Sequence, residues 1–141
     1  MTVPDIKAVL DYLQTKTLAT WPEVNGKLLR WTGYGWNTFP TPFAVLSVDL
    51  EASGEAMAAR DRPFAVSVSI YYGQKFTAGA DMGDTIWAKF KALLETLTDI
   101  HFTAECLGWR LVRVDFNSDL AALLAEQGMG VGRMILETTA V

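Results

Sequence analysis

The stretch RPFAVSVSIYYGQ, residues 62–74, alternates between large apolar side chains and mostly small ones. Successive residues of a β-strand point to opposite faces of the sheet, so this period of two indicates a strand. One face of that strand is apolar and is expected to meet a core layer. The large apolar side chains are those of Phe64, Val66, Val68, Ile70 and Tyr72.

The residues just before this stretch predict its partner. Residues 43–50 are apolar and rich enough in β-branched side chains to form a second strand, and residues 51–61 are small, charged and glycine-containing. We therefore expect the two strands to pair as a long antiparallel ribbon, with residues 51–61 as an exposed connection at or near its tip.

Two segments show the spacing of a helix with one apolar side. Residues 4–19 form the first, with Pro4 in the first turn and Trp21-Pro22 at the end. The second runs from Asp81, a predicted N-cap, to about Asp99. The apolar positions are Ile6, Val9, Leu10 and Leu13 in the first helix, and Ile86, Phe90, Leu93, Leu94 and Leu97 in the second.

The remaining segments complete the element order. Residues 27–31 predict a short strand, residues 118–124 a short helix capped by Ser118, and residues 129–141 a last strand. Residues 109–116 alternate, with Trp109, Leu111, Arg113 and Asp115 on one face and Arg110, Val112, Val114 and Phe116 on the other. The order favours one α+β domain over residues 1–141, an antiparallel or mixed β-sheet with two main helices packed on one face.

Composition excludes several classes of protein. The chain has 141 residues, half of them hydrophobic, and a net charge of −4, so it can bury a core without a metal or a disulfide. Its 12 basic residues are scattered, which disfavours binding to nucleic acid or to a membrane surface. Cys106 is the only cysteine, no apolar run approaches the roughly 20 residues of a membrane span, and the N-terminus does not resemble a signal peptide. We expect synthesis in the cytosol, and departure from it only inside a larger particle.

The sequence contains few candidate catalytic residues. His101 is the only histidine, and no glycine-x-serine-x-glycine motif is present. With Asp99 and Cys106 it would make a poor metal site, and Asp81 and Asp84 are better explained as helix-start residues. The glycines of GMGVG, residues 128–132, precede a predicted strand rather than the helix that a phosphate loop requires. We expect no catalytic, cofactor-binding or metal-binding residues, and no enzymatic activity.

Two segments remain as candidate contact surfaces. Arg60 and Arg62 lie beside a segment that carries Glu51 and Glu55. This tip is either a solvated loop or a self-complementary interface, in which opposite charges on neighbouring copies set the register.

The second segment is the loop at residues 32–42, which combines glycines and prolines with Tyr34, Trp36 and Phe39. These aromatic side chains either cover the core or form an interface patch, because aromatic residues are enriched at protein contacts.

The whole pattern resembles a known family. An amphipathic first helix is followed by a strand with an acidic end at residues 46–51, an arginine-bearing alternating strand at residues 60–72, and a helix with Ile86, Trp87 and Phe90. Strands at residues 109–116 and 133–139 close the chain. This arrangement resembles the tail terminator, or minor tail completion, proteins of long-tailed bacteriophages and prophages over nearly the whole chain.

The resemblance implies an α+β sandwich whose copies form a hexameric ring on the last ring of the tail tube. Such a ring ends tube polymerisation and joins the tail to the head. The implied partners are other copies of the chain, the tail tube protein, the head–tail connector or neck protein, and the sheath protein. The implied location is the virion tail, after synthesis in the host cytoplasm.

Three alternatives remain open. The chain could be another phage neck or tail tube component, or an assembly adaptor without a virus. It could also be a small-molecule binding domain or an enzyme of unrecognised type, with a pocket between helix and sheet that uses Tyr34, Trp36, Asp99 and His101.

Overall fold

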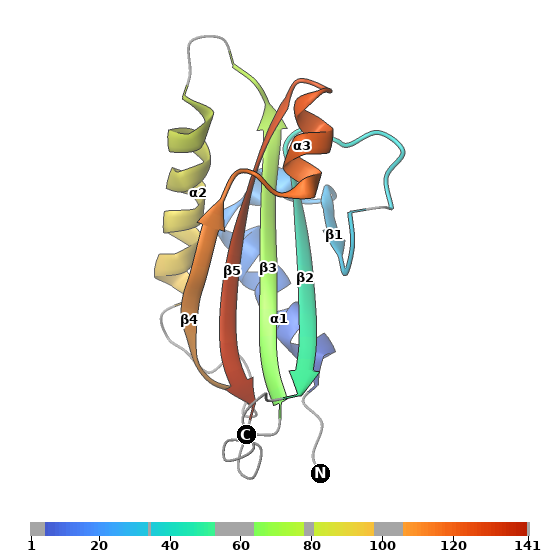
Figure 1. Cartoon of the computed structure of the whole chain (residues 1–141). Coiled ribbons are helices and arrows are strands. Elements are labelled where there is room, and N and C mark those ends of the chain that lie inside the picture. Colours follow the sequence, from blue (N-terminus) through green and yellow to red (C-terminus); the bar gives the residue numbers. More distant parts are fainter. Residues whose placement is uncertain (1–4, 34, 53–63, 78–80, 98–105, 141) are drawn as a thin grey trace.

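The computed structural model describes residues 5–33, 35–52, 64–77, 81–97 and 106–140. Figure 1 shows these residues as an elongated sheet with helices packed on it. The elements in chain order are α1 (Ile6–Thr20), η1 (Pro22–Val24), β1 (Leu28–Arg30), β2 (Phe43–Ala52), β3 (Phe64–Lys75), α2 (Met82–Thr96), β4 (Cys106–Asp115), α3 (Asp119–Ala125) and β5 (Met129–Ala140).

The sheet has five strands in the order β1-β2-β3-β5-β4. β1 runs parallel to β2, and all other neighbouring strands are antiparallel, so the sheet is mixed. The predicted ribbon is confirmed as the β2–β3 pair, which runs from Phe43 opposite Gly73 to Ala52 opposite Phe64. Its connection, residues 53–63, lies outside the described residues.

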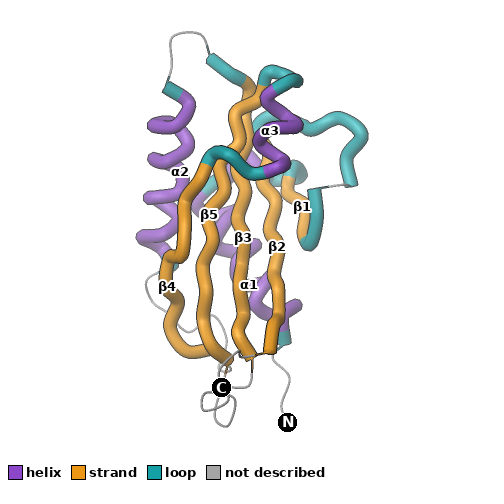
Figure 2. Tube along the Cα trace, viewed as in Figure 1, coloured by secondary structure: helices purple, strands orange, loops and turns teal. Residues whose placement is uncertain are grey.

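Helices lie on both faces of this sheet. Buried side chains of α1 and α2 join one core cluster with the large apolar side chains of β3, so the two main helices share a face. In Figure 2, α1 lies behind the sheet, whereas α3 lies in front of it near the upper end. The predicted α+β fold, a mixed sheet with two main helices on one face, is therefore confirmed.

The main core is organised around Trp21, which follows α1 directly. Its ring meets Tyr72 of β3 edge-on, with centroids 5.0 Å apart, and lies 5.9 Å from the ring of Phe90 of α2. Its indole Nε1 donates a hydrogen bond to the carbonyl oxygen of Lys89 at 3.1 Å. One buried aromatic residue thus ties the end of α1 to both the sheet and α2, and satisfies its own polar atom while doing so.

The helices α1, α2 and α3 each begin with a side-chain cap. Asp81 Oδ1 accepts a hydrogen bond from the Asp84 amide, and Ser118 Oγ accepts one from the Ala121 amide, as predicted. At α1 the cap is Asp5, which accepts from the Ala8 amide. The first helix therefore begins at Ile6, two residues later than predicted.

The alternation predicted for residues 109–116 is wrong in part. Trp109 and Val114, five positions apart, both pack against the main core, although strict alternation would put them on opposite faces. The reason is a register shift between Leu111 and Arg113, where β4 has one more residue than its partner β5. An extra residue in one strand reverses the faces of all that follow it.

Candidate assembly surface

The aromatic loop covers a second, smaller core on the α3 face. The rings of Trp36 and Phe39 lie 5.9 and 4.9 Å from the buried ring of Phe43, and 5.3 Å from each other, all in edge-to-face geometry. Both side chains are half-buried against this cluster, which also contains Leu124 of α3. Their packing fits a lid over the core, and Tyr34 lies outside the described residues.

The predicted charged tip is described only at its start. Glu51 is exposed near the end of β2. Glu55, Arg60 and Arg62 fall within residues 53–63, outside the described residues, so their part in an interface stays a prediction.

The residues considered for metal binding give no site where the chain is described. Asp99 and His101 lie outside that part, and Cys106 begins β4. Among residues 5–33, 35–52, 64–77, 81–97 and 106–140, no three histidine, cysteine, aspartate or glutamate side chains are grouped so as to hold a metal ion.

A cavity of about 250 Å³ lies on the α3 face of the sheet. Its floor carries Arg133, whose Nε and Nη2 donate hydrogen bonds to Asp115 Oδ2 at 3.1 and 2.8 Å. Burial lowers the pKa of Arg133, but the hydrogen bonds to Asp115 and Tyr71 outweigh it and hold the pKa above its usual value. The charge of Arg133 in this cavity is thus already paired with a carboxylate. The lining residues are Trp31, Thr32, Gly33, Val45, Ser47, Tyr71, Asp119, Leu120 and Arg133.

A second, apolar cavity of about 320 Å³ lies at the end of the molecule where α2 begins, between α2 and α3. Phe76 and Phe116 line it, and each exposes about half of its surface. In Figure 1, the start of α1 and the end of β5 lie at the opposite end of the sheet.

The sheet has two edges that no described strand covers. β4 is the last strand in the order, so its outer side has no partner among the described residues. On the opposite side, β1 pairs with only Ala44, Val45 and Leu46 of β2. Residues 47–52 of β2 therefore form a second uncovered edge within the described part of the chain.

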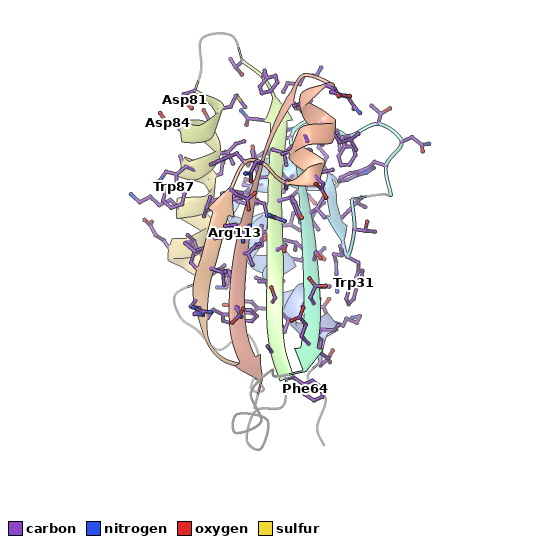
Figure 3. All side chains as sticks on the ribbon, in the orientation of Figure 1. Trp31, Phe64, Asp81, Asp84, Trp87 and Arg113 are labelled. Atoms are coloured by element: carbon purple, nitrogen blue, oxygen red, sulfur yellow. The ribbon has the colours of Figure 1, made fainter. Side chains whose placement is uncertain are left out.

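The β4 edge combines apolar and basic side chains. Leu111 and Val112 each expose 43% of their surface, and Trp87 of α2 exposes 41%. Arg110 and Arg113 are also exposed on β4, and Figure 3 shows Arg113 and Trp87 on the same flank of the molecule. The other edge is acidic, because Asp49 and Glu51 are exposed there on β2.

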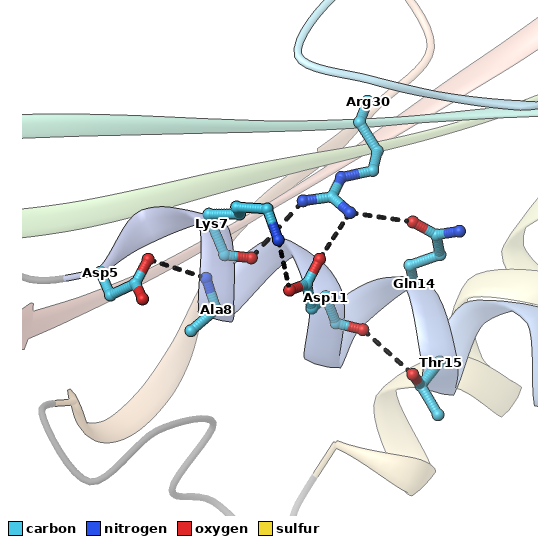
Figure 4. Close-up of polar contacts among 7 residues, drawn as sticks. All are labelled: Asp5, Lys7, Ala8, Asp11, Gln14, Thr15 and Arg30. Atoms are coloured by element: carbon cyan, nitrogen blue, oxygen red, sulfur yellow. Dashed lines mark hydrogen bonds and ion pairs between the residues drawn. The ribbon is translucent and has the colours of Figure 1, made fainter.

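Arg30 fixes the position of the short strand β1. Its Nη1 donates hydrogen bonds to Asp11 Oδ1 at 2.6 Å and to Gln14 Oε1 at 3.3 Å, and its Nη2 reaches the carbonyl oxygen of Lys7 at 3.5 Å (Figure 4). These contacts hold the end of β1 against α1. The uncovered part of β2 begins directly beyond this anchor.

Comparison with known proteins finds chains of similar fold but no matching sequence family. No protein-family model matches the chain, and no curated protein sequence matches it. The fold is similar to that of a chain in the virion of a native gene transfer agent particle, with a TM-score of 0.52 and 11% identity, over 94% of this chain and 90% of that one. A weaker likeness, with a TM-score of 0.43 and 12% identity, covers 99% of this chain and 58% of a chain from the sheath/tube terminator of an extracellular contractile injection system. Within the described residues, no helix is both long and apolar enough to cross a membrane.

Proposed function

We propose that this chain is a structural subunit of a virion tail or a tail-like particle, and that its copies form a closed ring at the end of the tail tube. The observation that carries the proposal is the fold shared, over nearly all of both chains, with a chain of a gene transfer agent virion. The resemblance to tail terminators supplies the finer expectations: six copies, an end to tube polymerisation, and a surface for head–tail joining.

The mechanism of such a ring is steric and involves no reaction. One face of the ring matches the end of the tube, and the other lacks the surface on which a further tube ring would assemble. The apolar cavity lined by Phe76 and Phe116 lies at one end of the chain, and this position supports a ring with unlike faces. The proposed partners are the tail tube protein, the head–tail connector and the sheath protein, with the virion tail as the location.

The closed ring requires a heterologous contact, in which one flank of a copy meets the opposite flank of the next. The two uncovered sheet edges, basic and apolar on one side and acidic on the other, support this kind of contact. The tip at residues 51–62 remains a second proposed contact, through Glu51, Glu55, Arg60 and Arg62.

Light scattering across a range of concentrations tests the ring first. We expect a mass of about six subunits, and ring-shaped particles in electron micrographs. Tubes assembled from the tube subunit of the same genome should stop growing when this chain is added. A chain that is monomeric at every concentration, and that neither binds tube ends nor limits tube length, would contradict the proposal.

Charge reversal tests the predicted tip. The double substitution Arg60→Glu and Arg62→Glu should impair assembly and leave the fold unchanged, as measured by circular dichroism. Reversal of Lys75, an exposed residue at the far end of β3, is the matched control. Assembly of the double variant at the wild-type level would remove the tip from the interface.

The cavity on the α3 face is the specific observation that favours a second candidate, a small-molecule binding domain. Of the residues predicted for such a site, Trp36 is described and does not line this cavity, and Tyr34, Asp99 and His101 lie outside the described part. Arg133 is already paired with Asp115 there, so its charge is not available to select a ligand. Replacement of His101 by alanine tests the enzymatic alternative, because a catalytic histidine cannot be lost without loss of activity.

A further inference from the structure

We infer that neighbouring copies of this chain join through their sheet edges, the β4 edge of one copy against residues 47–52 of β2 in the next, with Arg110 beside the neighbour's Asp49. This inference rests on the proposed ring and names the surfaces that close it. Four observations carry it: the direction of the edge strands, the register across the sheet, the charges, and the exposed apolar side chains.

Strand direction allows the contact. Three antiparallel steps separate β2 from β4, through β3 and β5, so the two edge strands run in opposite directions. A rotation about an axis along the strands leaves these directions unchanged from copy to copy. β4 of one copy therefore meets β2 of the next in the antiparallel sense, which is the more stable pairing of two strands.

The register places opposite charges at the two ends of one row. Asp49 pairs with Ser67, Ser67 pairs with Glu137, and Glu137 pairs with Arg110. Residues in register share a face and lie side by side. When copies join without stagger, the row continues from Arg110 of one copy to Asp49 of the next.

The charged side chains at these edges are exposed and could form ion pairs with a neighbouring copy. Arg110 contacts Glu137 at 3.2 Å but leaves 73% of its side chain exposed. Asp49, Glu51 and Arg113 make no ion pair with any other described residue. The contact would place Arg110 between Glu137 of its own copy and Asp49 of the next, and would bring Arg113 to the same acidic edge.

The alternative join, between two β4 edges related by a two-fold axis, is electrostatically unfavourable. It would bring Arg110 and Arg113 of one copy towards the same arginines of the other, and like charges at a contact disfavour association. It would also use the same edge of both copies, so assembly would stop at a pair.

Apolar side chains and bulges define the extent of the contact. Leu111 and Val112, directly after Arg110, are exposed in the isolated chain and would be covered by the neighbour. Register shifts occur on both sides of Arg110 and Leu111. Bulges limit how far an edge strand can pair, which restricts the contact to a short segment and guards against open-ended sheet growth.

Charge exchange tests the pairing of Arg110 with Asp49. Asp49→Arg and Arg110→Asp should each raise the concentration for half-assembly by about tenfold or more, because like charges then meet at every joint. The double variant restores opposite charges and should return to within about threefold of the wild type. Glu126→Arg, an exposed acidic residue at the end of α3, is the matched control and should assemble normally.

Cross-linking tests the geometry directly. Cysteines are introduced at positions 49 and 110 in a Cys106→Ser background, so that they are the only thiols. Under oxidation or with a short bis-maleimide, the double variant should give a ladder of covalent oligomers, because each copy then offers one thiol on each flank. Variants with only one of the two cysteines should give dimers at most.

The outcomes separate this inference from the proposed ring. In one outcome, light scattering detects oligomers that give no cross-linked ladder and that still assemble when either charge is reversed. That result would overturn the edge contact, but it would not contradict the proposed ring. Efficient dimerisation of the variant with a single cysteine at position 110 would identify the two-fold join instead, and would also overturn it. A monomer with no ladder at any concentration would overturn it too, and the tube-length measurement would then decide the proposed function independently.

Discussion

Gly73 lies directly opposite Phe43 in the β2–β3 pair, and any side chain at Gly73 would overlap the Phe43 ring. The ring cannot move aside easily, because it is buried and the rings of Trp36 and Phe39 pack against it. This glycine is therefore needed for close packing and not for a turn. The aromatic loop and the central strand depend on each other through this one contact.

Gly73→Ala should lower the free energy of unfolding by about 1–3 kcal/mol, the usual effect of overpacking a core. Gly33→Ala is the matched control, because a Cβ there would meet Phe39 and Val45 at ordinary contact distances of 3.5 and 3.6 Å. Urea unfolding of both variants measures the difference. Equal stability of the two would show that the Phe43 ring has space to move.

The lid and interface alternatives for the aromatic loop predict different results. Trp36→Ala removes a ring packed on Phe43 and should cost about 2–4 kcal/mol of stability. Trp31→Ala changes a tryptophan that is 48% exposed and should cost much less. Thermal unfolding and light scattering on each variant distinguish the two roles. If Trp36→Ala kept full stability and lost assembly, Trp36 would be an interface residue.

The Arg133–Asp115 pair should be structurally important because both side chains are largely buried. Asp115→Ala leaves the Arg133 guanidinium without its carboxylate, and should cost about 1.5–3 kcal/mol. Glu137→Ala breaks a pair whose arginine is mostly exposed, and should cost about 1 kcal/mol or less. Denaturant midpoints compare the two. A larger effect at Glu137 would contradict this order.

Alkaline pH should destabilise the fold through Tyr72. Burial raises the pKa of its phenol, and the nearby Glu23 carboxylate raises it further by its charge and by a hydrogen bond. Because the folded-state pKa exceeds the unfolded value of about 10, the stabilisation is complete below pH 10 and is lost as the pH rises above it. Stability measured from pH 8 to 11 should fall less steeply in Tyr72→Phe, and identical slopes would refute this.

Acidic pH should destabilise the fold through protonation of Glu23. Burial raises the pKa of this carboxyl. The hydrogen bond from Lys89 and smaller contributions outweigh burial, so that the pKa lies below its usual value. The Lys89 Nζ lies 2.7 Å from Glu23 Oε1. The stabilisation is present above the unfolded pKa of about 4.3 and is lost as the pH falls through the lower folded value. Glu23→Gln should show a smaller loss of stability between pH 6 and 3. An unchanged acid profile would assign this loss to other carboxylates.

Local patterns in the sequence predict the elements but not all of their neighbours. The alternation at residues 62–74 and the helical spacing at Ile86 and Phe90 specify a strand, a helix and the face that each buries. Nothing local specifies that β5 inserts between β3 and β4, that β1 lies parallel to β2, or that α3 packs on the opposite face from α1. These arrangements depend on contacts between distant segments.

The candidate assembly surface, too, could be predicted only in part from the sequence. Exposed charges and loop aromatics are visible in the sequence, and they make Glu51, Trp36 and Phe39 candidate contact residues. The alignment of Asp49 with Arg110 passes through two intervening strands and a bulged one, so no spacing along the chain indicates it. The exposure of Leu111 and Val112 likewise depends on β4 being the last strand.

The three-residue length of β1 decides which strand forms the edge of the sheet beyond Arg30. If β1 extended along all of β2, it would itself become the edge strand there, and residues 47–52 of β2 would no longer be open to a neighbour. Because β1 stops at Arg30, where α1 holds it, residues 47–52 of β2 form the edge on that side. On the edge contact inferred above, a designed extension of β1 by four or five residues would separate Asp49 from the neighbour's Arg110 and should therefore prevent this contact.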